Sequence, residues 1–300
     1  MSYIITAIAA KELPSDIQTT IESHLIGQEV KFVKSSVLAA GKAVDFFVDV
    51  ENADNVSKKI KLINIPQVDL AFQKDSDARK NKKLAVFDMD STLIYQEVIE
   101  LIAAQAGVED EVARITNLAM NGEIDFQESF RRRVNLLKGI PSADLWAKLK
   151  PQLNLTNGTK QLCATLKKNG CVLAVCSGGF LPLAEHVKEL LGLDYAFANQ
   201  LKTQVVDGTE VLSGEPAGEI VDGNKKKAVL LELAAKHGVS LANSVAVGDG
   251  ANDLLMMGAA GLGLAWNAKP KVQLEADCRL NTDSLADALY IFGYTDKELE

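Results

Sequence analysis

The sequence is poor in the residues that build disulfide frameworks and metal–thiolate sites. It has only four cysteines and three histidines among 300 residues. No two cysteines form a CxxC pair, and the histidines show no metal-ligand spacing. We therefore predict buried free thiols in a reducing compartment, and hence a cytoplasmic location, in preference to disulfides or a zinc site.

The chain also lacks a basic charge excess and a long hydrophobic run at its start. Residues 1–10 are apolar but too short for a spanning helix, and no basic residue precedes them, so we expect a strand there and not a signal peptide. The formal net charge of −8 argues against a nucleic-acid or anionic-membrane partner. An anionic small substrate remains compatible, because a metal ion and a few basic residues can set the local field.

What the sequence does contain is sufficient for two domains, since 47% of its 300 residues are hydrophobic. Residues 1 to about 72 alternate strand and helix patterns in the order βαββαβ, which predicts a small α+β domain with helices on one face of an antiparallel sheet. The strands are expected at 3–9, 30–39, 43–50 and 68–72, and the helices near 14–27 and 53–62. We assign residues 1–75 to this domain, 76–83 to a charged linker, and 84–300 to a second domain.

In the second domain, three short apolar runs each end at a polar residue that can take part in phosphate chemistry. Continuous apolar runs of this length are typical of fully buried parallel strands, and ligands bind beyond the carboxyl ends of such strands. The pattern therefore predicts a Rossmann-like parallel sheet with its site at that edge. The runs are 84–87, 172–176 and 245–248, and the polar residues after them are Asp88, Asp90, Ser177, Asp249 and Asp253.

Carboxylates gathered at one edge repel each other unless a cation lies among them, and oxygen ligands suit Mg²⁺. Asp88 can attack a phosphorus atom, and Asp90 can donate and accept the protons of that reaction. The alternative is a turn whose Asp residues cap a helix. Asp249 is expected to bind the metal, with Asn252 and Asp253 orienting the site.

Positive charge and backbone N–H groups are also needed around a transferring phosphoryl group. Ser177 and the glycines after it can hold phosphoryl oxygens, although the same sequence is common in plain turns. Residues 225–227 are three lysines that could supply this charge, and their spacing does not choose among them. The alternative for this run is a solvated helix start.

Between the first two strands of this core the sequence is almost entirely helical. A stretch from about 96 to 165 is expected to form a helical cap that excludes water from the site. Within the cap, Arg131, Arg132 and Arg133 could bind a substrate carboxylate, and Glu97 could bind an amino group. The alternative for these residues is a solvated surface. A further segment, 197–212, carries Asp207-Gly208 and is expected to be a hairpin.

These residues together resemble the phosphoserine phosphatases, a family of the haloacid dehalogenase superfamily. The resemblance covers about residues 84–290. It is carried by DxDST at 88–92, SGG at 177–179, GDGAND at 248–253 and the cap segment 126–139. Residues 1–72 resemble an ACT-type regulatory domain only in the order of their elements.

The resemblance implies a role for each residue at the edge of the sheet. Asp88 would be the phosphorylated nucleophile and Asp90 the general acid and base, with Mg²⁺ held by Asp88, the Asp90 backbone carbonyl and Asp249. It selects Lys226 from the three lysines. Ser177, Gly178, Lys226 and Asn252 would bind the phosphoryl group, and Glu97, Phe126 and Arg133 the serine portion.

We therefore predict an Mg²⁺-dependent enzyme that hydrolyses O-phospho-L-serine to L-serine and phosphate, the last step of serine biosynthesis. The alternatives are a phosphotransferase that passes the phosphoryl group to homoserine or another alcohol, and a non-catalytic amino-acid sensor. The expected binding partners are therefore a small-molecule substrate, phosphoserine, and a metal cofactor, Mg²⁺. A homodimer through the N-terminal domain is left open.

Overall fold

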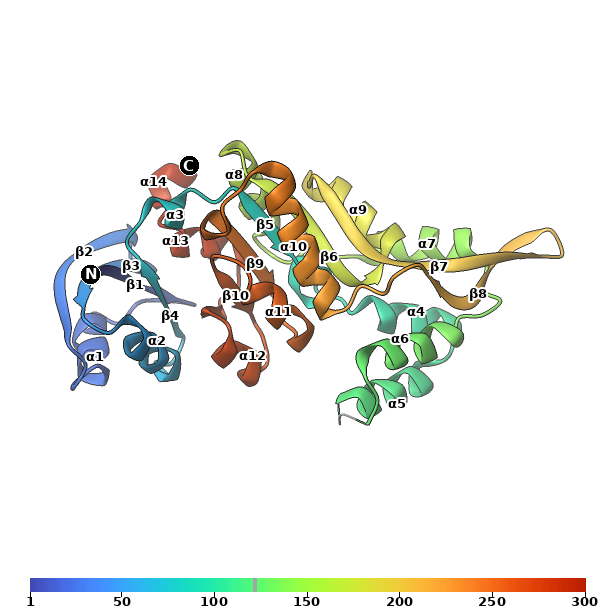
Figure 1. Cartoon of the computed structure of the whole chain (residues 1–300), viewed down its shortest axis with the longest axis horizontal. Helices are drawn as coiled ribbons and strands as arrows, with labels where there is room; N and C mark the ends of the chain where they lie inside the picture. The colour runs from blue at the N-terminus through green and yellow to red at the C-terminus, as the bar shows by residue number, and fades with distance from the viewer. Residues whose placement is uncertain (121–122) are drawn as a thin grey trace.

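The computed structural model describes residues 1–120 and 123–300, and these form two β-sheets surrounded by helices (Figure 1). The N-terminal sheet has the order β2-β3-β1-β4, and every neighbouring pair is antiparallel. Its strands are β1 (Ser2–Ala9), β2 (Val30–Ala39), β3 (Ala43–Val50) and β4 (Val68–Lys74), and its helices are α1 (Ile17–His24) and α2 (Ala53–Leu62). The predicted βαββαβ order is confirmed.

The apolar spacing of the two helices explains how they cover this sheet. Helix α1 buries Ile17 and Ile21, and α2 buries Val56 and Ile60, so each helix presents an i, i+4 pair to the core. Asn52 caps the N-terminus of α2, because its side chain accepts a hydrogen bond from the Asn55 N–H.

The second sheet has the order β11-β10-β9-β5-β6-β7-β8 and is parallel except for the last pair. Its strands are β5 (Leu84–Phe87), β6 (Val172–Phe180), β7 (Tyr195–Val206), β8 (Thr209–Ala217), β9 (Ser244–Gly248), β10 (Gly263–Trp266) and β11 (Cys278–Leu280). All four residues of this sheet's central strand, β5, are buried. The predicted Rossmann-like α/β core is therefore confirmed.

Helices cover both faces of this sheet. Leu84 and Val86 point to the face covered by α10 (Gly223–His237), α11 (Leu254–Met257) and α12 (Pro270–Glu275). Ala85 and Phe87 point to the opposite face. That face packs against α8 (Thr159–Lys168), α9 (Leu181–Leu191) and α13 (Ala288–Ile291). Because both faces are covered, the runs 84–87, 172–176 and 245–248 in the central strands are apolar and do not alternate with polar residues.

Four helices follow β5 and lie away from this sandwich. They are α4 (Val98–Ala106), α5 (Glu109–Met120), α6 (Phe126–Asn135) and α7 (Ser142–Leu149). Figure 1 places them at the end of the molecule opposite the N-terminal sheet. We refer to these four helices as the cap.

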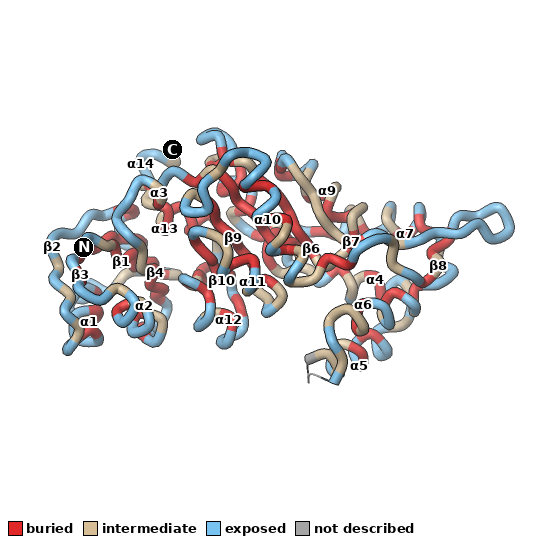
Figure 2. The backbone as a smooth tube through the Cα atoms, viewed as in Figure 1, coloured by how far each residue is buried: buried red, intermediate tan, exposed pale blue. Residues whose placement is uncertain are grey.

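The hairpin β7–β8 extends beyond the core sheet and supports the cap. Its turn has Asp207 at φ 49° and Gly208 at φ 78°, the two positive values that a tight hairpin turn requires. The Gly139 N–H, between α6 and α7, donates to the Leu212 carbonyl oxygen at 2.8 Å. Figure 2 shows the tip of the hairpin exposed and its base buried.

The segment expected to be a linker is partly structured and anchors the N-terminal sheet. It forms the short helix α3 (Asp77–Lys80), and Arg79 is only 8% exposed. Arg79 binds both carboxylate oxygens of Asp45, at 2.7 and 2.8 Å, and its Nε donates to the Ile291 carbonyl oxygen at 3.0 Å. The charged sequence therefore contains a buried ion pair, which composition alone does not predict.

The short helix α14 (Asp296–Leu299) follows α13 near the end of the chain.

The cysteines and the hydrophobic segments agree with the sequence. All four cysteines are buried and free, as predicted. Within residues 1–120 and 123–300, none of the helices has the length and apolar character needed to cross a bilayer.

Candidate functional site

The register of the three central strands brings their carboxyl ends together. Phe87, the last residue of β5, pairs with Val175 of β6 and Val247 of β9. The residue after β5 is Asp88, and its N–H donates to the Val247 carbonyl oxygen at 2.8 Å. The polar residues that follow the three strands therefore lie at one edge of the sheet.

Asp88 and Lys226 form a buried ion pair at this edge. Lys226 Nζ lies 2.7 Å from Asp88 Oδ1, and this lysine is fully buried on the first turn of α10. The Met89 N–H also donates to Asp88 Oδ1, at 2.8 Å. In the described part of the chain no hydrogen bond occupies Asp88 Oδ2, which leaves this oxygen available for chemistry.

The structure distinguishes the three consecutive lysines. Lys225 pairs with Glu219 at 2.9 Å, and Lys227 is exposed. Lys226 contacts Asp253 as well as Asp88, with Nζ 2.7 Å from Asp253 Oδ1. Burial works against the charge of Lys226, but the carboxylates of Asp253 and Asp88 raise its pKa above the ordinary value.

Asp88, Asp249 and Asp253 present carboxylate oxygens that all lie within 4.8 Å of one another. Both oxygens of Asp253 are already occupied, because Lys226 binds Oδ1 and the Gly250 N–H donates to Oδ2 at 3.0 Å. Asp88 and Asp249 therefore have the oxygens best placed to hold a cation. This donor set, all oxygen and strongly acidic, fits a hard divalent ion.

The pKa values of these carboxyl groups reflect their crowding. Burial, and then the charge of Asp253, raises the pKa of Asp249 to about 7. The same two causes raise the pKa of Asp88 well above its usual range, against the opposing charge of Lys226. A bound cation would relieve this repulsion.

Asp90 is held by hydrogen bonds to both of its carboxylate oxygens. The Val98 N–H donates to Oδ1 at 2.8 Å, and Ser177 Oγ donates to Oδ2 at 3.1 Å. Burial, and then the charge of Glu97, raises the pKa of Asp90 to about 7. A carboxyl group with this pKa can both donate and accept a proton near neutral pH.

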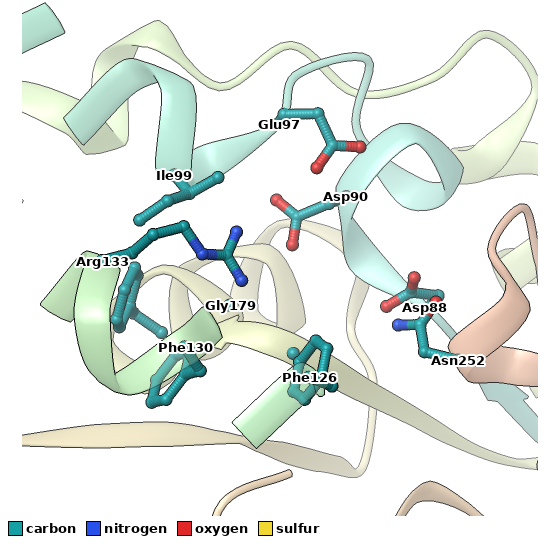
Figure 3. Close-up of a pocket in the computed structure, with 11 residues that line it drawn as sticks. Asp88, Asp90, Glu97, Ile99, Phe126, Phe130, Arg133, Gly179 and Asn252 are labelled. Atoms are coloured by element: carbon teal, nitrogen blue, oxygen red, sulfur yellow. The ribbon is translucent and has the colours of Figure 1, made fainter. Parts of the chain in front are cut away.

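The chain around Asp90 turns sharply to bring Glu97 back toward it. Ser91 has φ 53°, an uncommon value for a residue with a side chain, and its Oγ donates to Glu97 Oε1 at 2.6 Å. Figure 3 shows the carboxylates of Glu97 and Asp90 facing each other.

A cavity of ≈ 120 Å³ lies between these acidic residues and the cap. The residues from the core form one side of it and the residues from α4 and α6 form the other. It is lined by Asp88, Asp90, Glu97, Ile99, Phe126, Phe130, Arg133, Gly178, Gly179, Phe180 and Asn252.

The cap side of this cavity offers one guanidinium and two aromatic rings. Figure 3 shows Arg133 directed toward Asp90 and Glu97. Phe126 and Phe130 stack with their ring centroids 6.4 Å apart. A side chain at Gly178 would come within 3.1 Å of the Phe126 ring, so glycine permits the close approach of the cap.

The three arginines of α6 differ in their surroundings. Arg131 and Arg132 are exposed, and Arg132 pairs with Glu128 at 2.7 Å. Arg133 is partly buried and lines the cavity. Arg131 and Arg132 are therefore solvated surface charges, which was the alternative to a role in binding the substrate carboxylate.

The structure brings the predicted site residues into one region, though not all reach the cavity. Ser177 contacts it through Asp90, and Lys226, Asp249 and Asp253 lie behind Asp88. Those that line it are Asp88, Asp90, Glu97, Phe126, Arg133, Gly178 and Asn252.

Sequence reasoning missed several polar residues that support this region. Thr92 Oγ1 donates to Asp249 Oδ1 at 3.2 Å. Gln127 of the cap donates through Nε2 to Asp222 Oδ2, at 2.9 Å, and so links α6 to the start of α10. Asn199, in strand β7, was also missed. Asn is disfavoured in strands, so its position there is the one sequence feature that could have pointed to a special role.

Comparison with known proteins gives the same picture. Residues 82–261 match the family model of the haloacid dehalogenase-like hydrolases. The phosphoserine phosphatase of Saccharomyces cerevisiae is 47% identical over 306 residues, which cover 99% of this chain and 98% of that protein.

Solved structures are similar over both the whole chain and its second domain. A haloacid dehalogenase-family hydrolase from Salmonella enterica serovar Typhi superposes with a TM-score of 0.80 at 27% identity, covering 97% of this chain and 98% of that one. A substrate-bound phosphoserine phosphatase has a TM-score of 0.64 at 44% identity, covering 70% of this chain and 98% of that one.

Proposed function

Because the chain belongs to the haloacid dehalogenase-like hydrolases, and within them to the phosphoserine phosphatases, we propose that Asp88 carries out the first step of O-phospho-L-serine hydrolysis. The protein is a phosphomonoesterase that yields L-serine and phosphate. The observation that carries the residue assignment is the shared cavity, in which Asp90 lies between Asp88 and Arg133 (Figure 3).

In the first half-reaction an oxygen of Asp88 attacks the phosphorus atom and the bond from phosphorus to the serine oxygen breaks. Asp90 donates its proton to that leaving oxygen. Its raised pKa of about 7 supports this role, because a fraction of Asp90 is protonated near neutral pH. The products are L-serine and an aspartyl-phosphate at Asp88.

In the second half-reaction Asp90, now a carboxylate, accepts a proton from water. The water oxygen attacks the phosphorus atom, and the bond from phosphorus to Asp88 breaks. Phosphate leaves, Asp88 returns as a carboxylate and Asp90 is again protonated. The hydrogen bonds from Val98 and Ser177 fix Asp90 for both proton transfers.

Mg²⁺ is the cofactor that best fits the acidic edge. We assign its protein ligands to Asp88, Asp249 and the backbone carbonyl of Asp90, while Asp253 holds Lys226. When bound, the ion offsets the negative charge of the carboxylates and of the phosphoryl group. Lys226 adds a fixed positive charge beside Asp88.

The phosphoryl group would be bound by Ser177, the Gly178 N–H, Lys226 and Asn252. The serine portion would lie against Glu97, Phe126 and Arg133. Arg133 can form a bidentate pair with the substrate carboxylate, and Glu97 can bind its ammonium group. The cap closes the cavity over both ends of the substrate and so limits attack by bulk water.

A phosphotransferase would use the same first half-reaction and differ only in the acceptor.

The N-terminal domain, residues 1–75 in our assignment, has the element order of an ACT-type domain, and we propose a regulatory role for it. The enzymatic family membership leaves no place for the non-catalytic sensor as the protein's main function.

The direct test is phosphate release from a panel of phosphomonoesters. We expect phosphoserine to be hydrolysed fastest with Mg²⁺ present, and a chelator to abolish the activity. Asp88→Asn should abolish turnover, whereas Asp144→Asn, on the exposed side of cap helix α7, should not. Equal turnover of all substrates, or measurable hydrolysis by Asp88→Asn, would contradict the assignment.

A further inference from the structure

The side chain of Asn199 joins two neighbouring backbone segments beside the proposed phosphoryl site. Asn199 lies in β7 and is 2% exposed. Its Nδ2 donates to the Gly178 carbonyl oxygen at 2.8 Å, and its Oδ1 accepts from the Val221 N–H at 2.7 Å. A carbonyl can only accept and an N–H can only donate, so these partners fix the orientation of the amide.

The first of these bonds replaces a missing part of the sheet. Strands β6 and β7 pair at Cys176 with Phe197 and again at Phe180 with Asn199, and the register shifts between the two pairs. Residues 177–179 of β6 therefore bulge out of the ladder, which leaves their backbone groups without strand partners. Asn199 binds the bulge back to β7 through the Gly178 carbonyl.

This bond fixes the peptide between Gly178 and Gly179 at both ends. The Gly178 oxygen accepts from Asn199, and the Gly179 N–H donates to Ser177 Oγ at 2.8 Å. Ser177 Oγ in turn donates to Asp90 Oδ2 at 3.1 Å. A continuous chain of hydrogen bonds thus runs from Asn199 to the carboxyl group of Asp90.

The second bond reaches the helix that carries Lys226. Val221 immediately precedes Asp222, which caps α10 by accepting from the Lys225 N–H at 3.0 Å. Lys226 is the next residue and lies 2.7 Å from Asp88 Oδ1. Asn199 therefore sets the spacing between the phosphoryl-binding bulge and the start of the lysine helix.

We propose that Asn199 is a positioning residue that holds the 177–179 bulge and the start of α10 in the arrangement needed to bind the phosphoryl group. This inference rests on the proposed function and extends it to a residue outside the cavity. A carboxamide is required because one side chain must donate to one segment and accept from the other. Neither a carboxylate nor an aliphatic side chain of similar size can do both.

The test compares wild type with Asn199→Asp, which keeps the shape but replaces the donor with a second acceptor. We expect kcat/KM for phosphoserine to fall by about 10- to 100-fold, since a buried carbonyl loses its partner. Binding of inorganic phosphate, measured by calorimetry with Mg²⁺ present, should weaken by a similar factor. Binding of L-serine, which contacts the cap end of the site, should change less than about twofold.

The pH dependence separates this role from a general loss of structure. When protonated, the introduced carboxyl group can donate to Gly178 and accept from Val221, as the native amide does. The ratio of wild-type to variant kcat/KM should therefore shrink as the pH falls. A variant that is merely less stable would show no such recovery.

Two further variants complete the experiment. Asn199→Ser removes the reach of the side chain without burying a charge, and it should lose phosphate affinity in the same way. Asn243→Asp is the matched control, because Asn243 also donates through Nδ2 to a backbone carbonyl, that of Asn81, far from the cavity. It should leave phosphate binding unchanged.

Wild-type phosphate affinity in either Asn199 variant, or an equal loss of phosphate and L-serine binding, would overturn the proposal. Failure of the proposed function looks different, because wild type itself would then not hydrolyse phosphoserine. The phosphate measurement needs no turnover and would still report on Asn199.

Discussion

Lys226 Nζ lies 2.7 Å from Asp88 Oδ1 with both residues buried, so the proposed nucleophile has a permanent positive partner. Lys226→Met would leave Asp88 and Asp253 without their cation. We expect turnover to fall at least about 10²-fold and the free energy of unfolding to fall by about 3–5 kcal/mol at neutral pH.

The adjacent Lys227 provides the matched control because it is exposed. Lys227→Met should leave both kcat and the unfolding free energy near wild type. Equal effects of the two substitutions, measured by steady-state kinetics and urea unfolding, would show that the buried pair has no special role.

Asp90→Asn tests the assignment of the general acid and base. The variant should lose about 10²–10⁴-fold in kcat, because the amide can neither transfer a proton to the serine oxygen nor take one from water. Wild-type activity should decline on the alkaline side as Asp90 loses its proton, and the variant should lack this decline. A pH–rate profile of unchanged shape in Asp90→Asn would refute the role.

The metal-free protein should become more stable as the pH falls. Asp90 and Asp249 have folded pKa values of about 7, above the unfolded value of 3.8. At a pH between the unfolded and folded pKa values, the native state binds more protons than the unfolded state, so the free energy of unfolding falls as the pH rises. The stabilisation from these two groups is fully present below the unfolded pKa and is lost once the pH passes the folded pKa.

Mg²⁺ should offset this loss, because it replaces the protons among the carboxylates. The difference in Tm between Mg²⁺-loaded and chelator-treated protein should therefore grow from about pH 5.5 to about pH 7 and then level off. Asp249→Asn should reduce the difference. A Tm difference that is constant with pH would count against a metal site here.

Arg133 should determine substrate choice. Phosphoethanolamine lacks the carboxylate and would leave the guanidinium unpaired in a closed site, which in the strongest known cases costs about 10⁴-fold. Arg133→Lys should also lose activity on phosphoserine, because an ammonium group cannot form the bidentate pair. Arg131→Lys, at an exposed position of the same helix, should have no effect. Equal kcat/KM values for the two substrates in wild type would disprove this assignment.

The N-terminal domain should be dispensable for chemistry but not for stability. Figure 1 shows it at the opposite end of the molecule from the cap. A chain starting at Ser76 would keep the whole site, but Arg79 would lose Asp45 and Thr6 and keep only carbonyl partners. We expect kcat/KM within about a hundredfold of wild type and a lower Tm. A larger loss of activity in folded, monodisperse protein would mean that this domain helps to build the site.

Much of this arrangement can be predicted from local patterns. The succession of strand and helix patterns in the N-terminal domain predicts the strands Val30–Ala39 and Ala43–Val50 and the helix Ala53–Leu62 with their observed bounds. The parallel core follows from the continuous apolar runs, because a strand covered on both faces needs no polar residue. The polar residues after those runs then have to share one edge.

The rest depends on contacts between distant segments. Nothing in the residues near Asn199 indicates that residues 177–179 of β6 bulge out of the sheet, or that the Val221 N–H lies within hydrogen-bond distance of Asn199. Arg79 lies in a charged stretch that looks solvated, and only the folded chain brings Asp45 to it. Both cases involve a buried polar group whose partner is set by tertiary structure.

We propose that phosphoserine turnover passes through a covalent phosphoryl group on Asp88. The most direct measurement is to quench the enzyme with acid during turnover of labelled phosphoserine and to map the trapped phosphoryl group by mass spectrometry. We expect a label on Asp88 that hydroxylamine removes, as is characteristic of an acyl phosphate, and no label in Asp88→Asn. Rapid turnover without a labelled enzyme, or a label on any other residue, would contradict it.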